Sequence, residues 1–492
     1  MMEHALERYA LGLFWAALRY SLAPDLSNPL AKDRAMRADA ALARLVAGYA
    51  QLPALRGTYQ NQYAALLAQA RSLADASGLG AVQPLAAAGT GADSPLFVGV
   101  PGVAGDLEAL LVAVNDAGVH RSGSEDRVDA LLRDVARVEA QCRGDYEERV
   151  LGMQPRLGAQ AREHRNDQEL NAESLQRYLR HHPRGTADLR VRKVTEIPGG
   201  RSKRTALVEL EPGSALPAEL VLRLDNDRGV GTSVIGEFPL LERVSRLGLP
   251  VPEPLWLEAS SEPFSQPFIV FRRSPGAAAG GLIEGAFRKE PRTARALAQA
   301  LARVHAAGAA LIEDPAERAS AVSHTRELLA YYLNHWRSKK PFPSLVIEAA
   351  FIWMFRRLDQ GLGEATVVHA DTGFHNLLLD EGGKACLLDW EFAHFGDPAE
   401  DLASCRPAVE KCMPWPEFMA EYQAHGGKPV SDFRLNFWEI WRPLRNAVVC
   451  GTTLHSLLNG EANDIDPVTI GCSTFQRLQA DLARSLDALV TR

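Results

Sequence analysis

Polar residues at the ends of three short apolar runs, between positions 366 and 401, could carry out phosphoryl transfer. The first run leads to Asp371, and the next two carry Asn376 and Asp389 at their ends. A neutral oxygen and a carboxylate suit a hard cation such as Mg²⁺, which usually binds a protein through one or two carboxylates and substrate phosphates. Asp371 lies outside this pair, where a carboxylate can orient a hydroxyl group and receive its proton. A base, a metal ligand, a hairpin and a second metal ligand follow the order expected for phosphoryl transfer.

The second and third runs are expected to pair as a β-hairpin around Gly382. Leu377–Leu379 leads into the turn sequence Asp-Glu-Gly-Gly, and Cys386–Leu388 follows it. Their spacing from the turn predicts that Asn376 and Asp389 face each other, with their Cβ atoms roughly 5 Å apart. A buried hairpin with a polar loop is the plain alternative, but the consistent placement of several polar residues favours a catalytic site.

A glycine turn further upstream could bind phosphate. It contains Gly199, Gly200 and Ser202 and joins two strand-like runs, 191–197 and 205–210. Glycine lets backbone N–H groups approach a phosphate closely. A pair of glycines is also common in an ordinary hairpin turn. The interpretation that this turn binds phosphate is therefore supported only by the residues that follow it.

The next strand and helix carry an arginine and a glutamate at suggestive positions. Arg223 lies in the strand-like run 219–224, and Glu237 lies in the first turn of a predicted helix, 236–244. In kinase-like folds, a cation on a strand binds the α- and β-phosphates and is held by a glutamate on a helix. A surface ion pair is the alternative interpretation.

Three motifs together resemble those of the aminoglycoside phosphotransferase (APH) family, whose members are kinase-like enzymes that phosphorylate hydroxyl groups of small molecules. They are His-Ala-Asp-x-x-x-x-Asn from His369, Leu-Leu-Asp-Trp-Glu up to Glu391, and Gly-Asp-Pro-x-x-Asp-Leu-Ala from Gly396. The sequence looks most like the branch found beside, or fused to, acyl-CoA dehydrogenases. The resemblance extends from about Leu189 to the C-terminus.

The resemblance implies an α+β protein-kinase-like fold with two lobes, a small antiparallel-sheet N-lobe and a helical C-lobe. It implies ATP and Mg²⁺ as cofactors and a small-molecule hydroxyl compound as substrate. Asn376 and Asp389 would bind the metal, and Asp371 would be the catalytic residue. The order of these parts agrees with the one derived above from residue types alone.

For the nucleotide, the resemblance implies that the glycine turn and Arg223, held by Glu237, contact the phosphates. Main-chain groups near Phe271 would pair with the edge of the adenine. Lysine is the common residue at the position of Arg223, but arginine keeps the charge and can bind phosphate through two N–H groups.

The segment after Asp389 departs from the Asp-Phe-Gly of protein kinases and reads Asp-Trp-Glu. Glu391 is expected either to assist a second metal or to hydrogen-bond the loop. We expect His369 to support the loop through hydrogen bonds, and Asp397 and Asp401 to stabilise the structure around the metal site.

The identity of the acceptor stays open at this point. The resemblance to the branch that accompanies acyl-CoA dehydrogenases favours a hydroxyacyl-CoA or a similar lipophilic alcohol over an antibiotic of the aminoglycoside type. The C-terminal region contains both acidic and basic side chains, which suit either class. A nucleotide-binding pseudokinase scaffold is the alternative from another class, although the joint presence of Asp371, Asn376 and Asp389 speaks against it.

Composition indicates an ordinary globular protein. The chain has 492 residues, of which 46% are hydrophobic, and a formal charge of −7. We therefore expect no nucleic-acid partner. The six cysteines show no Cys-x-x-Cys pair, so neither a disulfide framework nor zinc is expected. No apolar run approaches the roughly 20 residues that span a bilayer, and no signal peptide is recognisable, so a cytoplasmic location is expected.

Periodicity divides the chain into four parts. We predict an all-helical accessory domain at 1–150, a linker with a helix at 151–188, the kinase-like N-lobe at 189–275 and the helical C-lobe at 276–492. The accessory domain could form a homodimer surface, cover the substrate site or brace the catalytic part.

Helices are predicted where apolar residues recur at helical spacing. The predicted ranges outside the N-lobe are 1–20, 34–50, 60–76, 126–141, 167–179, 295–307, 325–336, 344–358, 415–425, 433–457 and 475–490. The segments 78–105 and 277–281 are predicted to be loops because small residues and helix breakers alternate there.

Overall fold

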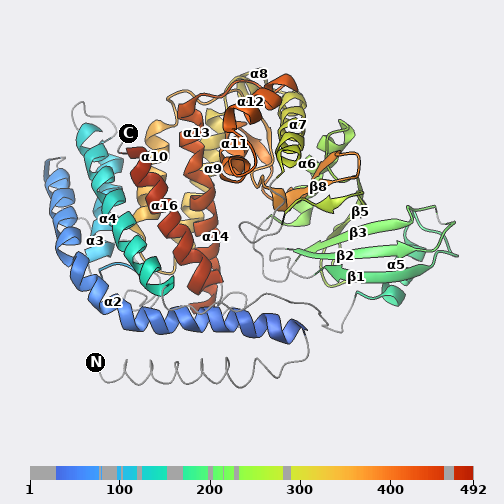
Figure 1. The fold of residues 1–492 in the computed structure, drawn as a ribbon, viewed down its shortest axis with the longest axis horizontal. Coiled ribbons are helices and arrows are strands. Elements are labelled where there is room, and N and C mark those ends of the chain that lie inside the picture. The colour runs from blue at the N-terminus through green and yellow to red at the C-terminus, as the bar shows by residue number, and fades with distance from the viewer. Residues whose placement is uncertain are drawn as a thin grey trace. The chain divides into compact units, whose positions relative to one another are not determined.

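A computed structural model describes residues 29–76, 79, 97–100, 103–118, 125–151, 170–197, 203–213, 215–225, 232–280, 290–458 and 470–490. The chain forms two compact units (Figure 1). The first, called the helical unit, combines Met1–Glu163, Arg326–Gln360 and Glu439–Arg492. The second, called the mixed unit, combines His164–Thr325 and Gly361–Trp438.

The helical unit is built from long helices that pack through apolar faces. Helix α4 contacts α2, α10 and α16, and α16 also contacts α14. Tyr63, Leu131, Phe351 and Leu482 are fully buried, so helices from all three chain segments share the core. The described elements are α2 (Pro29–Ala76), α3 (Val103–Gly118), α4 (Glu125–Leu151), most of α9 (Val322–Lys339), α10 (Leu345–Arg357), α14 (Trp441–Leu458), η5 (Ile470–Thr474) and α16 (Phe475–Val490).

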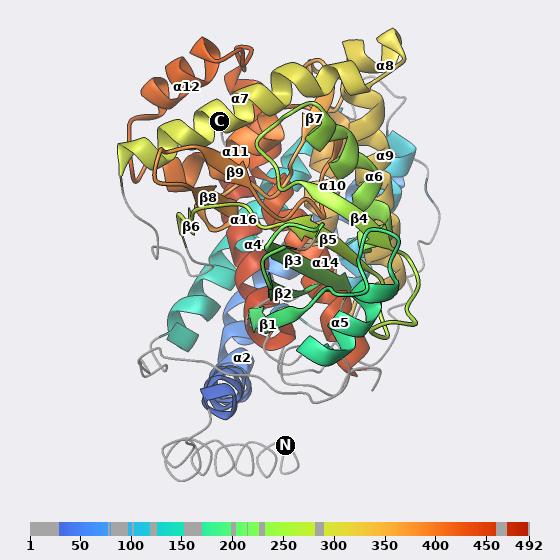
Figure 2. The same cartoon turned by 90° about the vertical axis from the view of Figure 1, so that its right-hand side faces the viewer.

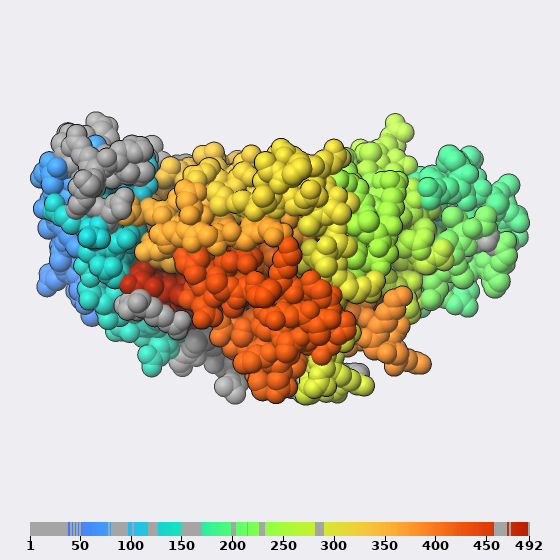
Figure 3. Space-filling model, turned by 90° about the horizontal axis from the view of Figure 1, so that it is seen from above, coloured from blue at the N-terminus to red at the C-terminus, as the bar shows by residue number. Residues whose placement is uncertain are grey.

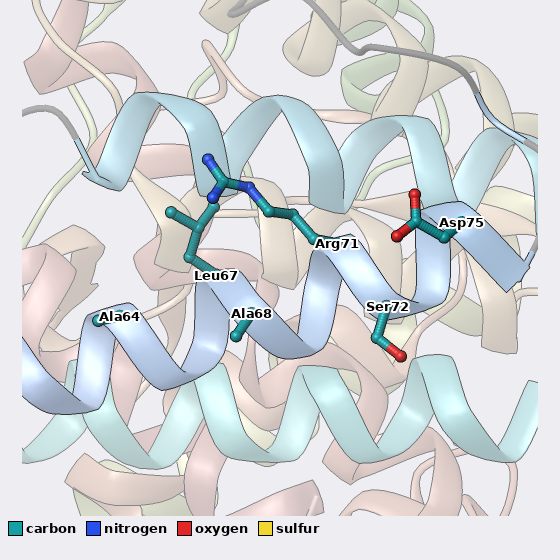
Figure 4. Close-up of a pocket in the computed structure, with 6 residues that line it drawn as sticks. All are labelled: Ala64, Leu67, Ala68, Arg71, Ser72 and Asp75. Carbon is teal, nitrogen blue, oxygen red and sulfur yellow. The ribbon is translucent and has the colours of Figure 1, made fainter.

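A shallow hollow of about 520 Å³ lies on the exposed side of α2 (Figure 4). Arg71, on its rim, forms an ion pair with Asp106 of α3 at 3.6 Å. The hollow is lined by Ala64, Leu67, Ala68, Arg71, Ser72 and Asp75. Within the described ranges, no helix combines the length and the apolar composition needed to cross a membrane.

A buried ion pair connects α3 to the start of α10. Lys340 donates to Glu108 Oε2 at 2.5 Å, and Glu108 Oε1 accepts the backbone N–H of Ser344 at 2.9 Å. Both charged side chains are almost fully buried. Burial raises the pKa of Glu108, and Lys340 offsets part of that effect. One carboxylate thereby neutralises a buried ammonium group and caps the N-terminus of a helix.

The five-stranded sheet of the mixed unit has the order β1-β2-β3-β5-β4, with every neighbouring pair antiparallel. Its strands are β1 (Val191–Ile197), β2 (Lys203–Leu210), β3 (Glu219–Asp225), β4 (Pro254–Glu258) and β5 (Phe268–Arg272). Helix α5 (Ala172–His181), which begins with an Asn171 capping box, lies beside β1 (Figures 1 and 2). Helix α6 (Val234–Arg246) packs on β3, β4 and β5.

The two faces of β3 serve different purposes. Leu222 and Leu224 join the apolar core that includes Leu175 and Leu179 of α5. Because side chains alternate along a strand, Arg223 points to the opposite face, where α6 lies. The alternation therefore places a charged residue between the sheet and α6.

The rest of the mixed unit is mainly helical. Helix α7 packs on β7 and on α12, and the surfaces of α7 and α12 adjoin (Figure 3). A Cβ at Gly308 would lie 2.8 Å from Val367 Cβ, so glycine permits the close approach of α7 to β7. The helices are α7 (Pro291–Gly308), η3 (Ala309–Leu311), α8 (Pro315–Ala319), η4 (Phe374–Asn376), α11 (Ala399–Val409), α12 (Trp415–Ala424) and α13 (Asp432–Glu439).

Two small sheets lie among these helices. β7 (Thr366–Val368) pairs with β10 (His394–Gly396). β8 (Leu377–Leu379) pairs with β6 (Ala277–Ala278) and with β9 (Ala385–Leu387). Gly276 has φ +112°, and a Cβ there would lie 2.5 Å from Leu379 O, so only glycine fits where the chain approaches β8. Part of the predicted loop 277–281 is therefore a strand.

The predicted α+β class is confirmed, with a helical N-terminal region, an antiparallel sheet and a helical part after it. The strands 191–197, 205–210 and 219–224 and the helix 475–490 agree with prediction to within two residues. The helix predicted at 1–20 lies outside the described residues. The predicted domain boundaries stay a prediction, and the helical unit also contains Arg326–Gln360 and Glu439–Arg492, which were assigned to the C-lobe.

Three helix predictions were wrong. The ranges 34–50 and 60–76 belong to one helix of 48 residues that continues through Pro53, next to the buried Leu52 and Leu55. Helix α3 was missed because its start was read as part of the glycine-rich loop 78–105. The range 433–457 is two helices that are separated at Ile440.

Replacing Lys340 by Met should lower the free energy of unfolding by about 3–5 kcal/mol, because Glu108 would remain buried without its cation. Replacing Arg326, whose ion pair with Asp359 is exposed, should change it by less than about 1 kcal/mol. Urea unfolding of the full chain measures both values. Equal effects of the two substitutions would show that the buried pair has no special role.

Candidate active site

The loop after β7 is held by a buried carboxylate from α11. Asp401 is fully buried and accepts the backbone N–H groups of His369 at 2.8 Å and Ala370 at 2.7 Å. It also accepts a hydrogen bond from His305 Nε2 at 3.0 Å, and its own carbonyl accepts the hydroxyl of Thr372. Ala370 has φ +64°, a conformation that costs energy for a non-glycine residue and that these bonds support.

His369 acts as a structural bridge between two loops. Its Nε2 donates to Leu388 O at 2.7 Å, and its Nδ1 accepts the N–H of Asp371 at 3.3 Å. Its ring also packs edge-on against Trp390, with centroids 4.9 Å apart. Both ring nitrogens are thus used within the protein, which fits the predicted supporting role of His369.

Asp371 and Asn376 lie in direct contact. Asn376 Nδ2 donates to Asp371 Oδ2 at 2.9 Å and to Asp371 O at 3.0 Å. His375 Nε2 lies 3.5 Å from Asp371 Oδ2. The Asp371 side chain is 18% exposed, so a small molecule can reach a carboxylate whose position is fixed by its neighbours.

The predicted pairing of Asn376 with Asp389 across the hairpin is wrong by one residue. Leu377 pairs with Leu387, and the N–H of Leu388 donates to Asn376 O at 2.8 Å. Asp389 therefore follows the paired region and has φ +66°. The pairing is centred on Gly382, so Leu388, six residues after it, lies opposite Asn376, six residues before it, and Asp389 lies one residue further.

Arg223 connects the sheet, α6 and the segment after β9. Its Nη1 lies 3.3 Å from Glu237 Oε1, its Nη2 binds Asp389 Oδ1, and the same nitrogen lies 3.6 Å from Glu391 Oε2. Burial alone lowers the pKa of Arg223, but these three carboxylates raise it above its usual value. Burial raises the pKa of Glu237, which is itself almost fully buried.

Lys203, the first residue of β2, is a member of the same group of charges, and sequence reasoning missed its place. Its Nζ lies 3.3 Å from Asp225 Oδ1 and 3.5 Å from Glu391 Oε2. Lys203 belongs to the basic run Arg201-Ser202-Lys203-Arg204, which was the one signal in the sequence that could have pointed to it. The structure buries Lys203.

The structure thus brings together five predicted site residues in two groups, Asp371 with Asn376 and Arg223 with both Glu237 and Asp389. Phe271 lies inside β5, opposite Val221 and two residue pairs along the ladder from Arg223. Gly199, Gly200 and Ser202 lie outside the described residues. The roles of all these residues stay predictions.

The charges around Arg223 are of the sign that attracts a cation, although no group of three or more His, Cys, Asp or Glu side chains among the described residues is arranged to hold a metal ion. Lys203, Arg223, Asp225, Glu237, Asp389 and Glu391, called the charge cluster below, contain two more carboxylates than cations. Glu237 Oε2 is buried without a hydrogen-bond partner among the described residues. The amide nitrogen of Asn376 is used by Asp371, which leaves its oxygen as the atom that could face a metal.

A model of the phosphotransferase enzyme family (APH) matches residues 193–441 of the chain. This range contains every described residue of the predicted site. A search of curated proteins found no match.

The chain also matches solved structures of phosphotransferases and kinases. A choline/ethanolamine kinase family protein from Mesorhizobium loti shares 16% identity over 65% of this chain and 99% of that protein, with a TM-score of 0.45. Macrolide 2'-phosphotransferase MphH from Brachybacterium faecium shares 19% identity over 61% and 97%, with a TM-score of 0.41. A mutant of aminoglycoside phosphotransferase APH(4)-Ia, in a complex with ADP and hygromycin B, shares 20% identity over 59% and 95%, with a TM-score of 0.38.

Replacing Asp401 by Asn should lower the free energy of unfolding at pH 7 by about 3 kcal/mol, because the carboxylate holds His305 and two backbone N–H groups. Burial alone raises the pKa of Asp401, but the hydrogen bond and the charge interaction with His305, helped by His369, lower it below its usual value. The folded state therefore binds this proton less readily than the unfolded state. The stabilisation is fully present above the unfolded pKa of about 3.9 and is lost as the pH falls through the folded pKa.

Denaturant unfolding at several pH values between 7 and 3 tests this. The difference between wild type and Asp401→Asn should be constant above about pH 5 and should shrink below about pH 4. Asp359→Asn, at an exposed carboxylate, is the control and should show almost no difference. A difference that grows towards acid pH would contradict the assigned role.

Proposed function

Because the chain belongs to the phosphotransferase enzyme family (APH), we propose that this phosphotransferase moves the γ-phosphoryl group of ATP, with Mg²⁺, to a hydroxyl group of a small molecule. The observation that carries the proposal is the contact of Arg223 on β3 with both Glu237 on α6 and Asp389 after β9. A cation on a strand, a glutamate on a helix and an aspartate after a hairpin are the parts that kinase-like phosphoryl transfer uses. All three residues lie within the mixed unit.

Asp371 would act on the acceptor. Its carboxylate is fixed by Asn376, and its loop is fixed by Asp401. A carboxylate held in this way can orient an acceptor hydroxyl and receive its proton as the phosphoryl group is transferred. Fixing the carboxylate before the substrate binds also reduces the entropy that must be lost in the reaction.

Arg223 would bind the phosphates of the nucleotide. Its guanidinium is already charged and held by carboxylates, so it needs little reorganisation to face an anion. Asn376 and Asp389 would hold Mg²⁺, which supplies charge neutralisation at the phosphate oxygens when it is bound. The negative excess of the charge cluster supports this assignment.

For the acceptor, we propose a hydroxyacyl-CoA or a lipophilic alcohol of catabolism. This choice rests on the resemblance of the motifs to the branch that accompanies acyl-CoA dehydrogenases. Basic side chains of the C-terminal region give it little support, because Arg434 binds Asp397 and Arg406 binds Glu410. A cytoplasmic location and a homodimer through the helical N-terminal region stay predictions.

With Mg²⁺ and ATP, the purified protein should release ADP in the presence of one class among hydroxyacyl-CoAs, hydroxylated lipids, aminoglycosides and amino alcohols. Asp371→Ala should lower this rate by about 10²–10⁴-fold, because the general base is lost. A coupled ADP assay measures it. Glu381→Ala, an exposed carboxylate at the tip of the same hairpin, is the matched control and should keep the wild-type rate.

Two outcomes would overturn the proposal. A protein that binds no nucleotide cannot be a phosphotransferase of this kind. Acceptor-dependent ADP release that survives in Asp371→Ala would show that Asp371 is not the base. ATP binding with no turnover on any acceptor class would instead favour a nucleotide-binding scaffold.

Arg223→Met should lower kcat/KM for ATP by about 10²–10³-fold, because a preorganised positive charge at the phosphates is lost. Arg223→Lys keeps the charge but loses the paired N–H groups, so we expect a loss of about tenfold. Steady-state kinetics with ATP as the varied substrate measures both. If the two variants were equally impaired, the geometry of the guanidinium rather than its charge would be the decisive property.

A further inference from the structure

Lys203 is buried at a place where lysine needs charged partners. It is 4% exposed, and a lysine is rarely so buried unless it is paired. Its Nζ donates to Thr232 O at 2.5 Å, lies 3.3 Å from Asp225 Oδ1 and lies 3.5 Å from Glu391 Oε2. One ammonium group therefore contacts three different segments of the mixed unit.

Each of these segments leads to a residue of the proposed site. Asp225 accepts the N–H of Val234 at 2.9 Å and the hydroxyl of Ser233, so it holds the N-terminus of α6, the helix that carries Glu237. Glu391 lies two residues after Asp389. Lys203 itself is the first residue of β2. Its position therefore couples β2, α6 and the segment of Asp389.

Lys203 and Arg223 share one carboxylate. Glu391 Oε2 lies 3.5 Å from Lys203 Nζ and 3.6 Å from Arg223 Nη2. Without Lys203, the charge cluster would contain one cation and four carboxylates. The remaining carboxylates would then hold Arg223 more strongly and compete with the phosphates of a nucleotide.

We propose that Lys203 is a positioning residue for nucleotide binding. It neutralises Glu391 and fixes the start of α6, so that Glu391 competes less with phosphate for Arg223. This inference rests on the proposed function, because it takes Arg223 as the phosphate-binding cation. Lys203 does not contact the phosphates in this mechanism.

The test measures the dissociation constant of a fluorescent ATP analogue with Mg²⁺, which requires no knowledge of the acceptor. Lys203→Met should raise this constant by about tenfold, the effect of roughly one lost charge interaction. Lys203→Arg should restore most of the affinity, because it returns the charge. A purely structural loss of packing would not be rescued in this way.

Arg204→Met is the matched control. Arg204 is the next residue of β2, points to the opposite face and pairs with Glu196. Arg204→Met removes one positive charge, as Lys203→Met does, but leaves the charge cluster intact. The dissociation constant of the analogue should therefore stay within about twofold of the wild-type value. Equal weakening by Lys203→Met and Arg204→Met would indicate a general charge effect and overturn the proposal.

A double substitution tests whether Lys203 acts by neutralising Glu391 or only by its packing. Adding Glu391→Gln to Lys203→Met should recover part of the lost affinity, because the carboxylate that Lys203 neutralises is then gone. Fully additive losses would overturn the positioning role. If wild type binds the analogue and Lys203→Met binds it equally well, only this inference fails. If wild type binds no analogue, the proposed function fails with it.

Discussion

The partly buried Arg223 on β3 sets the main constraint on the mixed unit. Its charge can be held away from water only if carboxylates surround it, and these come from α6 and from the segment after β9. The sheet, the helix and the hairpin must therefore keep one arrangement for the charges to be compensated. The cluster still carries excess negative charge, which is a suitable state for a site that receives a cation together with an anionic nucleotide.

The loop of Asp371 depends on a second, separate set of interactions. Asp401 holds the backbone, His369 bridges to Leu388 O, and Asn376 holds the carboxylate. Positive φ values at Ala370 and Asp389 mark two places where the backbone is strained. The β8–β9 hairpin connects this loop to the charge cluster, because Asn376 precedes it and Asp389 follows it. The fold of the hairpin therefore fixes the positions of both residues.

Much of the mixed unit could be predicted because its signals are local. Alternating apolar residues predicted the strands, and the order of Arg223, Glu237, Asp371, Asn376 and Asp389 predicted the site. The buried place of Lys203 could not be predicted, because it depends on partners distant in the sequence. The register of Asn376 could have been counted, because Asn376 and Leu388 each lie six residues from Gly382. The membership of 326–360 in the helical unit likewise depends on contacts with α3 and α4, which no local pattern reveals.

Because the helical unit is made of three separate chain segments, it cannot be completed until the C-terminal segment has been synthesised. Helix α4 ends at Leu151, whereas α16, which packs against it, begins at Phe475. At translation rates of about 5–20 residues per second, the buried face of α4 waits for roughly 15–65 s before this partner emerges. During that interval α2 can already contact α4, but the face of α4 that α16 later covers is open to chaperones and to neighbouring nascent chains.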